Sequence, residues 1–171
     1  MEENISKSIS TNIIGTANIV RACSKRNIKL IYFSTNYVYP GVKGNYSEKD
    51  PVLPINNYAI SKLGGECAVQ LYKNSLILRL CMTEKPFVHK RAFKDVEMNF
   101  MFHEDLAKNL LKLINYKGII NIGGPKKIVF EFAKKTNNKI LPMSAKKKFG
   151  KSFPTKQTMN LKKYKKIINK N

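Results

Sequence analysis

The chain has 171 residues, which suits a single domain, and 43% of them are apolar, which is enough for a buried core. Its formal net charge of +21 creates a field that attracts nucleic acids and anionic surfaces without sequence specificity. Lysines occur along the whole chain without a nucleic-acid-binding signature, so we do not expect binding to a specific nucleic acid.

The cysteines and the hydropathy pattern indicate the cellular compartment in which the protein is expected. The three cysteines, Cys23, Cys67 and Cys81, are scattered, which favours buried thiols in a reducing compartment over disulfides or a metal site. No apolar run approaches ~18 residues, and the first residues lack a signal-peptide pattern. The sequence therefore predicts a soluble, cytoplasmic protein with no membrane contact.

The first segment, from about Asn4 to Lys25, has the apolar spacing of a helix. A glycine within a helix costs about 1 kcal/mol relative to alanine. Gly15 therefore predicts close packing or a local kink. The expected buried face of this helix consists of Ile5, Ile9, Ile13, Ala17, Val20 and Cys23.

A short apolar run over 29–33 predicts a buried strand that ends in two hydroxyl residues, Ser34 and Thr35. In open α/β sheets, ligands and chemistry gather at the carboxyl ends of the strands. A helix is predicted from about Asn57 to Tyr72. Within it, Tyr58 and Lys62 are four positions apart and so share one face.

A strand-end hydroxyl, a phenol and an ammonium group suit proton transfer to a carbinol or carbonyl oxygen. A free phenol has a pKa of about 10, and a cation within ~4–6 Å lowers it. We therefore expect Lys62 to lower the pKa of Tyr58, and Thr35 to hold the reacting oxygen. The Tyr-x-x-x-Lys spacing is weak by itself, because an ordinary surface pair on a helix has the same spacing.

The later part of the chain continues the alternation of strands and helices. Runs at 76–80 and 119–122 predict two further buried strands, and the second is expected to be parallel to the others. Between them, 82–101 has a mixed pattern, and a helix is expected to open at His103, where two acidic residues follow. A last helix is expected around 128–135.

A collinear series of motifs carries a family resemblance. It comprises STNYVYPG at 34–41, YSEKDP at 46–51, Pro54, NYA at 57–59 and SKLGGE at 61–66. The series resembles extended short-chain dehydrogenases/reductases that act on nucleotide sugars, specifically the dTDP-4-dehydrorhamnose reductase group. The resemblance extends from about Asn12 to Ala133. It implies an α/β fold with a Rossmann-like parallel sheet and flanking helices.

The resemblance also implies catalytic roles. Thr35, Tyr58 and Lys62 correspond to the family's catalytic set, and Asn12 to a residue that orders a water in the proton relay behind the lysine. Ser34 is expected to join Tyr58 and Lys62 at the nicotinamide cofactor, NADPH or NADH. For Asn12, a tolerated polar residue within a helix is the alternative.

Substrate contacts are implied for Asn36, Arg79, Lys90 and Arg91. Arg79 has the alternative of a solvated charge at a strand end, and Lys90 and Arg91 that of a solvated charge run. Basic residues there suit a diphosphate. Asn36 stands where close relatives carry Asp, so the resemblance does not identify the sugar of the substrate.

The expected activity is NAD(P)H-dependent reduction of a 4-keto-6-deoxy nucleotide sugar. The alternatives are a nucleotide-sugar epimerase or dehydratase of the same family, and a non-catalytic binding or regulatory homologue. The sequence contains no G-x-x-G-x-x-G or G-x-G-x-x-G loop. The N-terminal strands are therefore expected to be missing, as in a fragment, a split enzyme or a degenerate copy. The partner would be a complementing N-terminal half or a second copy.

Two regions are expected along the chain. Residues 1–135 would form a truncated NAD(P)-binding and catalytic domain, with substrate-binding insertions at about 81–103. Residues 136–171 contain no Asp or Glu and many lysines. They would complete the substrate domain or be partly flexible.

Overall fold

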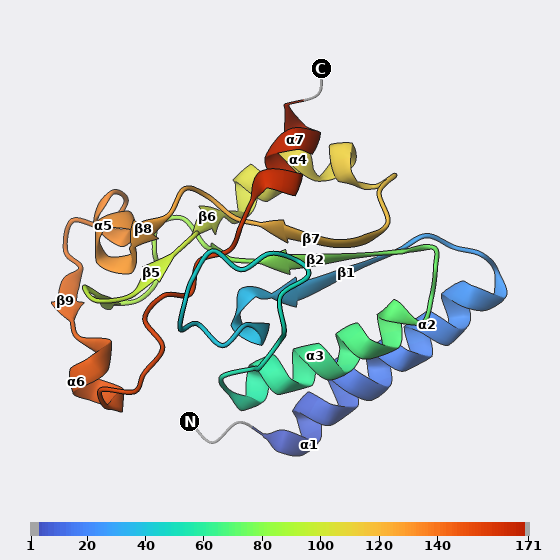
Figure 1. The fold of residues 1–171 in the computed structure, drawn as a ribbon, viewed down its shortest axis with the longest axis horizontal. Helices are drawn as coiled ribbons and strands as arrows, with labels where there is room; N and C mark the ends of the chain where they lie inside the picture. Colours follow the sequence, from blue (N-terminus) through green and yellow to red (C-terminus); the bar gives the residue numbers. More distant parts are fainter. Residues whose placement is uncertain (1–3, 170–171) are drawn as a thin grey trace.

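The computed structural model describes residues 4–169, which fold around a three-stranded parallel sheet (Figure 1). The strand order is β1 (Leu30–Thr35), β2 (Ser75–Leu80) and β7 (Gly118–Ile122). All three strands are parallel, with Phe33 opposite Leu78 and Leu78 opposite Ile120. The predicted α/β class, parallel sheet and three strands are confirmed. Ser34 and Thr35 are the last residues of β1, so the predicted position of two hydroxyl groups at the strand end is also confirmed.

One face of the sheet is covered by the N-terminal helical segment and by α3 (Asn57–Gln70), which lie side by side (Figure 1). The first segment is continuous through α1 (Ile5–Ser8), the π-helix η1 (Ile9–Gly15) and α2 (Thr16–Lys25). The irregularity predicted at Gly15 is therefore the end of a π-helical segment. Close packing occurs on α3, where a Cβ at Gly65 would overlap the carbonyl oxygen of Asn12.

The buried face predicted for the N-terminal helix is only partly formed. None of its described residues is fully buried. Ile5 and Ile9 are 61% and 43% exposed, whereas Ile13 and Val20 are half-buried against α3 and the sheet. The helix therefore leaves apolar surface open to solvent.

The other face of the sheet is covered by α4 (His103–Leu113) and α7 (Lys162–Ile168) (Figure 1). α4 starts at His103 as predicted, with Glu104 and Asp105 in its first turn, where carboxylates stabilise a helix dipole. The core on this side includes Leu76, Leu78, Leu113, Ile120 and Tyr164, all buried. Burial on both faces explains why the residues of β2 are apolar except for Ser75 and Arg79.

A second cluster of short elements lies beyond the carboxyl ends of the sheet strands (Figure 1). Its strands pair as β3 (Met82–Thr83) with β6 (Met101–Phe102), β4 (Arg91–Phe93) with β9 (Leu141–Met143), and β5 (Glu97–Met98) with β8 (Lys127–Ile128). Two helices complete it, α5 (Val129–Lys134) and α6 (Ala145–Phe149). The predicted helix around 128–135 is α5.

The segment after residue 135 touches both parts of the molecule. β9 pairs with β4, and α7 packs on β7. Asn160 donates its backbone N–H to the carbonyl of Tyr46, 2.7 Å away. Whether 136–171 acts as part of a substrate domain stays a prediction.

The three cysteines are free, but only Cys81 is buried; Cys23 is half-buried and Cys67 is exposed. The prediction of buried thiols is therefore wrong for Cys67, which lies on the outward face of α3. Among residues 4–169, no helix is both long enough and apolar enough to span a bilayer.

Candidate active site

The end of β1 and the start of α3 bring the predicted catalytic residues to one place. α3 begins after Asn56, the N-cap residue two positions before Tyr58, and the Asn56 side chain accepts a hydrogen bond of 2.8 Å from the Ala59 N–H. The Tyr32 hydroxyl on β1 donates to the Lys62 carbonyl at 2.9 Å, which fixes α3 against the strand. Thr35, 5% exposed, accepts the Tyr37 N–H at 3.3 Å. Lys62 therefore lies against Tyr32 of β1, and Tyr58, one helical turn earlier, lies near Tyr37, which follows the end of that strand.

The electrostatics of Tyr58 and Lys62 differ from the prediction. Burial raises the pKa of the Tyr58 phenol, and burial lowers the pKa of Lys62. The Lys62 ammonium lies 4.3 Å from the centroid of the Tyr32 ring. The prediction that Lys62 lowers the pKa of Tyr58 is thus wrong for this conformation, because the cation sits over another aromatic ring.

Asn12 lies in the π-helical segment and contacts α3 between the two predicted catalytic positions. Its amide donates to the Ser61 hydroxyl at 2.9 Å, and that hydroxyl donates to the Tyr58 carbonyl at 2.8 Å. π-Helical insertions occur frequently at functional sites. The contact places Asn12 next to the turn of α3 that carries Tyr58 and Lys62.

Arg79 and Ser34 both contact a buried carboxylate, that of Glu66. Glu66 lies one turn after Lys62 on α3, is fully buried and forms an ion pair with the Arg79 guanidinium. Ser34 donates its hydroxyl to Glu66 at 2.7 Å. Arg79 also donates to the Tyr39 hydroxyl at 2.7 Å. Burial by itself lowers the pKa of Arg79, but the hydrogen bond and charge of Glu66 outweigh it and leave that pKa raised.

These contacts correct two expectations. Arg79 is 3% exposed and is neither a solvated charge nor a group turned towards a substrate. The Ser34 hydroxyl, on a side chain that is 4% exposed, is likewise occupied by Glu66 rather than presented to a cofactor. Asn36 is also buried, and its amide lies 3.5 Å from the Gln157 carbonyl.

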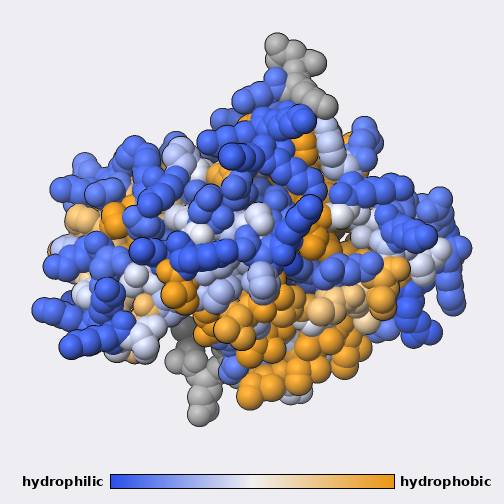
Figure 2. Space-filling view, in the orientation of Figure 1, coloured by the Kyte–Doolittle hydropathy of each residue, from blue (hydrophilic) through white to orange (hydrophobic). Residues whose placement is uncertain are grey.

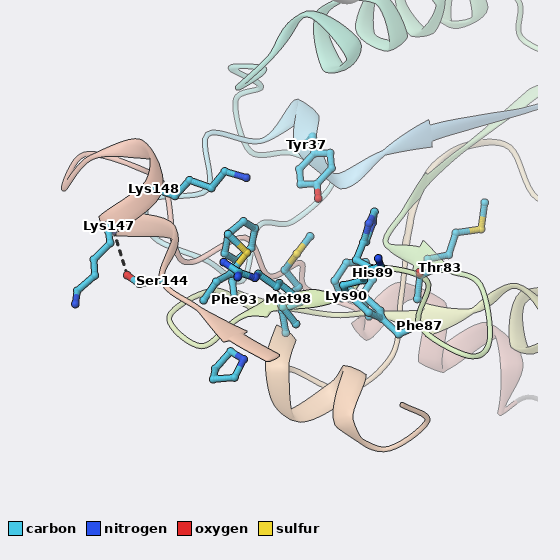
Figure 3. Close-up of a pocket in the computed structure, with 17 residues that line it drawn as sticks. Tyr37, Thr83, Phe87, His89, Lys90, Phe93, Met98, Ser144, Lys147 and Lys148 are labelled. Carbon is cyan, nitrogen blue, oxygen red and sulfur yellow. Dashed lines mark hydrogen bonds between the residues drawn. The ribbon is translucent and has the colours of Figure 1, made fainter. Parts of the chain in front are cut away.

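A cavity of about 970 Å³ lies beside this region (Figure 3). Lys90 and Arg91 line it, as the resemblance implies for substrate contacts. Its apolar surface comes mainly from aromatic and methionine side chains, among them Phe87, Phe93 and Met98. The lining residues include Lys147, Lys148 and His89 but no carboxylate. The cavity therefore suits an anion that carries an apolar or aromatic group.

Tyr37 connects the cavity to Tyr58. Its ring lines the cavity, and its hydroxyl points into it (Figure 3). Burial raises the pKa of the Tyr37 phenol, and nearby Cys81 and Tyr58 add to the shift. Tyr37 and Glu66 were not among the site residues predicted from the sequence. Glu66 could have been predicted, because Tyr58, Lys62 and Glu66 are spaced four positions apart and so share one face of a helix.

The two glycine pairs of the chain, Gly64–Gly65 and Gly123–Gly124, pack closely against neighbouring segments and do not form a phosphate-binding turn. Gly64 and Gly65 lie within α3, where Cβ atoms would meet Ile13 and Asn12. Gly123 and Gly124 pack directly on the backbone of Asn99 and Phe100. Among residues 4–169, no glycine-rich turn fits the pyrophosphate of a dinucleotide, whereas Tyr58 and Lys62 have the hydroxyl and ammonium groups that can contact a ribose.

Comparison with known proteins identifies the relatives of this site. The family model described as the RmlD substrate binding domain matches residues 1–90. The chain belongs to this family. The match includes Asn12, Thr35, Tyr58 and Lys62, together with the end of β1 and all of α3.

Two curated relatives are similar to this member of the RmlD substrate binding domain family. The probable low-salt glycan biosynthesis reductase Agl14 of Haloferax volcanii is 42% identical over 76 residues, or 42% of this chain and 25% of its own. The dTDP-4-dehydrorhamnose reductase of Aggregatibacter actinomycetemcomitans is 30% identical over 131 residues, or 72% of this chain and 40% of its own. The chain thus spans between a quarter and two fifths of these relatives.

Solved structures agree with the family. A hypothetical dTDP-4-dehydrorhamnose reductase from Sulfolobus tokodaii superposes with a TM-score of 0.82 at 27% identity, covering 97% of this chain and 68% of the other. The dTDP-4-dehydrorhamnose reductase of Bacillus anthracis in complex with NADP gives a TM-score of 0.74 at 25% identity, with coverages of 90% and 63%. The RmlD-like fold therefore extends over nearly the whole chain.

Proposed function

We propose that this chain provides the proton-transfer and substrate-binding part of an NAD(P)H-dependent reductase of a 4-keto-6-deoxy nucleotide sugar. The observation that carries the proposal is that α3, which bears Tyr58 and Lys62, packs against β1, which ends at Thr35, and that Tyr37, a neighbour of Tyr58, lines the cationic cavity. The curated and solved dTDP-4-dehydrorhamnose reductases support it.

Each residue has a role in this reaction. Thr35 would donate a hydrogen bond to the sugar oxygen, and Tyr58 would protonate that oxygen as its carbonyl is reduced. Lys62 would stabilise the resulting phenolate once its ammonium moves from the Tyr32 ring towards Tyr58. Asn12 would hold the turn of α3 that carries both groups through Ser61. Lys90 and Arg91 would bind the diphosphate in the cavity.

The nicotinamide cofactor would supply the hydride, and Tyr58 and Lys62 would bind its ribose. The pyrophosphate contacts would come from outside residues 4–169, for example from a complementing N-terminal half or another copy. The cytoplasm, where nucleotide sugars and reduced cofactors are present, is the proposed location.

The test is turnover of a dTDP-4-keto-6-deoxy sugar at millimolar NADPH or NADH, since weak cofactor binding is expected. Tyr58→Phe should lower turnover by ~10²–10⁴-fold, the range typical of a general acid. Nucleotide-sugar affinity, measured by calorimetry, should stay within about threefold, because the phenol acts mainly in proton transfer. Tyr116→Phe is the matched control, because it removes the same hydroxyl group near the amino end of β7, at the end of the sheet opposite the candidate site. Equal turnover by the two variants would overturn the role of Tyr58.

Nucleotide-sugar binding without reduction is the second candidate. It is favoured by the raised pKa of Tyr58 and by the placement of the Lys62 ammonium over Tyr32. Intact nucleotide-sugar affinity with no turnover, even with the complementing polypeptide added, would select this candidate over the reductase.

A further inference from the structure

The short helix α6 is tied to the loop that follows β4. The Asp95 carboxylate accepts hydrogen bonds from the Ser144 hydroxyl at 2.5 Å, the Ala145 N–H at 2.8 Å and the Lys146 N–H at 3.2 Å. Burial by itself raises the pKa of Asp95, but these hydrogen bonds outweigh it and lower that pKa. The start of α6 therefore has a fixed position relative to β4, the strand that begins with Arg91.

Strand pairing and aromatic packing hold the rest of α6 beside the cavity. Phe93 on β4 pairs with Met143 on β9, directly before α6. The Phe93 and Phe149 ring centroids lie 6.0 Å apart, and Phe149 stacks on Phe153 at 4.9 Å. α6 is thus held at its start by Asp95 and at its end by two aromatic rings.

Two lysines of α6, Lys147 and Lys148, are among the residues that line the cavity, and they take different directions. The Lys148 side chain extends towards Tyr37, whereas that of Lys147 turns away from it (Figure 3). The Lys148 ammonium lies 5.1 Å from the centroid of the Phe149 ring, a favourable cation–π placement. Lys90 and Arg91 reach the same cavity from the segment at the start of β4. Cations from two separate segments therefore line one cavity.

We propose that Lys148 determines specificity for a diphosphate over a monophosphate in this cavity, and that Asp95 is its positioning residue. The inference rests on the proposed function, because it takes the cavity as the nucleotide-sugar site. Lys90 and Arg91 bind one phosphoryl group, and Lys148 binds the other from α6. Charge-assisted N–H···O bonds to phosphate oxygens are the contacts expected of these groups.

The experiment is calorimetric titration of the full chain with dTDP, dTMP and thymidine. Lys148→Ala should weaken dTDP binding by about 10-fold, the lower range for a hydrogen bond to a charged group, and should leave dTMP almost unchanged. Lys146→Ala is the matched control, since Lys146 is exposed on the same helix and does not line the cavity. It removes the same charge and should change dTDP affinity by less than about twofold.

The role of Asp95 is tested in the same assay. Asp95→Ala should weaken dTDP binding about as much as Lys148→Ala, and should add little when both substitutions are combined, because the two residues act through one contact. Asp95→Asn, which keeps an acceptor for the N–H groups of α6, should restore part of the affinity. A full additional loss in the double variant would overturn the positioning role.

The outcomes separate this inference from the proposed function. Equal losses for Lys146→Ala and Lys148→Ala would show a general effect of net charge and overturn the inference, while the reductase proposal would stand. Tight dTDP binding that depends on Lys148, without turnover even when the complementing polypeptide is added, would support the inference and overturn the reductase. Absence of dTDP binding by the unmodified chain would overturn both.

Discussion

At the scale of single residues, the raised pKa of Tyr58 is the sharpest difference from what the sequence indicates. The predicted phenol and ammonium are both present, yet burial raises the pKa of Tyr58 and lowers that of Lys62. Both shifts favour the neutral forms. The pair therefore has the residues needed for proton transfer but, in this conformation, lacks the charge arrangement that would activate the phenol.

We expect Tyr58 in the isolated chain to titrate above its ordinary pKa of 10.0, because burial disfavours the phenolate. Lys62→Met should change that pKa by less than about half a unit, since the ammonium lies over Tyr32. The measurement is NMR titration of ¹³C-labelled tyrosines, with Tyr58→Phe used to assign the signal. A Tyr58 pKa below 10.0 that rises in Lys62→Met would show that the two groups already interact.

At the scale of elements, the Glu66–Arg79 ion pair joins α3 to the centre of the sheet. Glu66 shares the inward face of α3 with Lys62, and Arg79 lies within the middle strand β2. Ser34 on β1 donates to the same carboxylate. One buried polar cluster thus sets the position of the helix that carries Tyr58 relative to the strand that ends at Thr35.

Arg79→Met should lower the free energy of unfolding by about 3–5 kcal/mol, because it leaves the Glu66 carboxylate buried without its cation. Combining it with Glu66→Met should recover most of that loss, since no buried charge then remains. Urea unfolding followed by circular dichroism measures both.

The matched control is Lys126→Met, which removes a surface ion pair of 2.9 Å whose side chains are 60% and 30% exposed. It should change stability by less than about 1 kcal/mol. If Arg79→Met costs no more than this control, the buried pair does not anchor α3.

The helices and strands also show which parts of the fold could be predicted from the sequence. Apolar runs predicted β2 and β7 because both are buried on two faces, and the Tyr-x-x-x-Lys spacing located α3. The π-helical turns at Ile9–Gly15 were not predicted, since the spacing of apolar residues does not reveal that the Asn12 carbonyl of this segment packs directly on Gly65 of α3. The buried state of Arg79 likewise depends on Glu66, a partner 13 positions earlier. Residues that a motif brings together could be predicted, whereas their charge partners could not.

At the scale of the whole molecule, apolar surface is concentrated on one side. Figure 2 shows it as a broad patch over α2 and α3, in the lower part of the view. Ile14, Ile19 and Ile60 are each more than half exposed. Nearby, a groove of about 360 Å³ lies between α2 and β1. Within residues 4–169, β1 pairs with β2 on one edge and with no strand on the other. Such an edge and such a patch favour association with another chain.

We therefore expect the isolated chain to self-associate through this side despite its charge of +21. Ile14→Glu combined with Ile19→Glu should shift the molecule towards monomer, because the carboxylates would have to be buried in the contact. Light scattering over a range of concentrations at about 0.15 M salt measures the shift, since charge repulsion is largely screened there. The control is Leu111→Glu, at a position 77% exposed on α4, on the opposite side of the sheet. It should leave the association unchanged. A chain that stays monomeric at all concentrations, or one that Leu111→Glu dissociates equally well, would show that α2 and the edge of β1 do not form the contact.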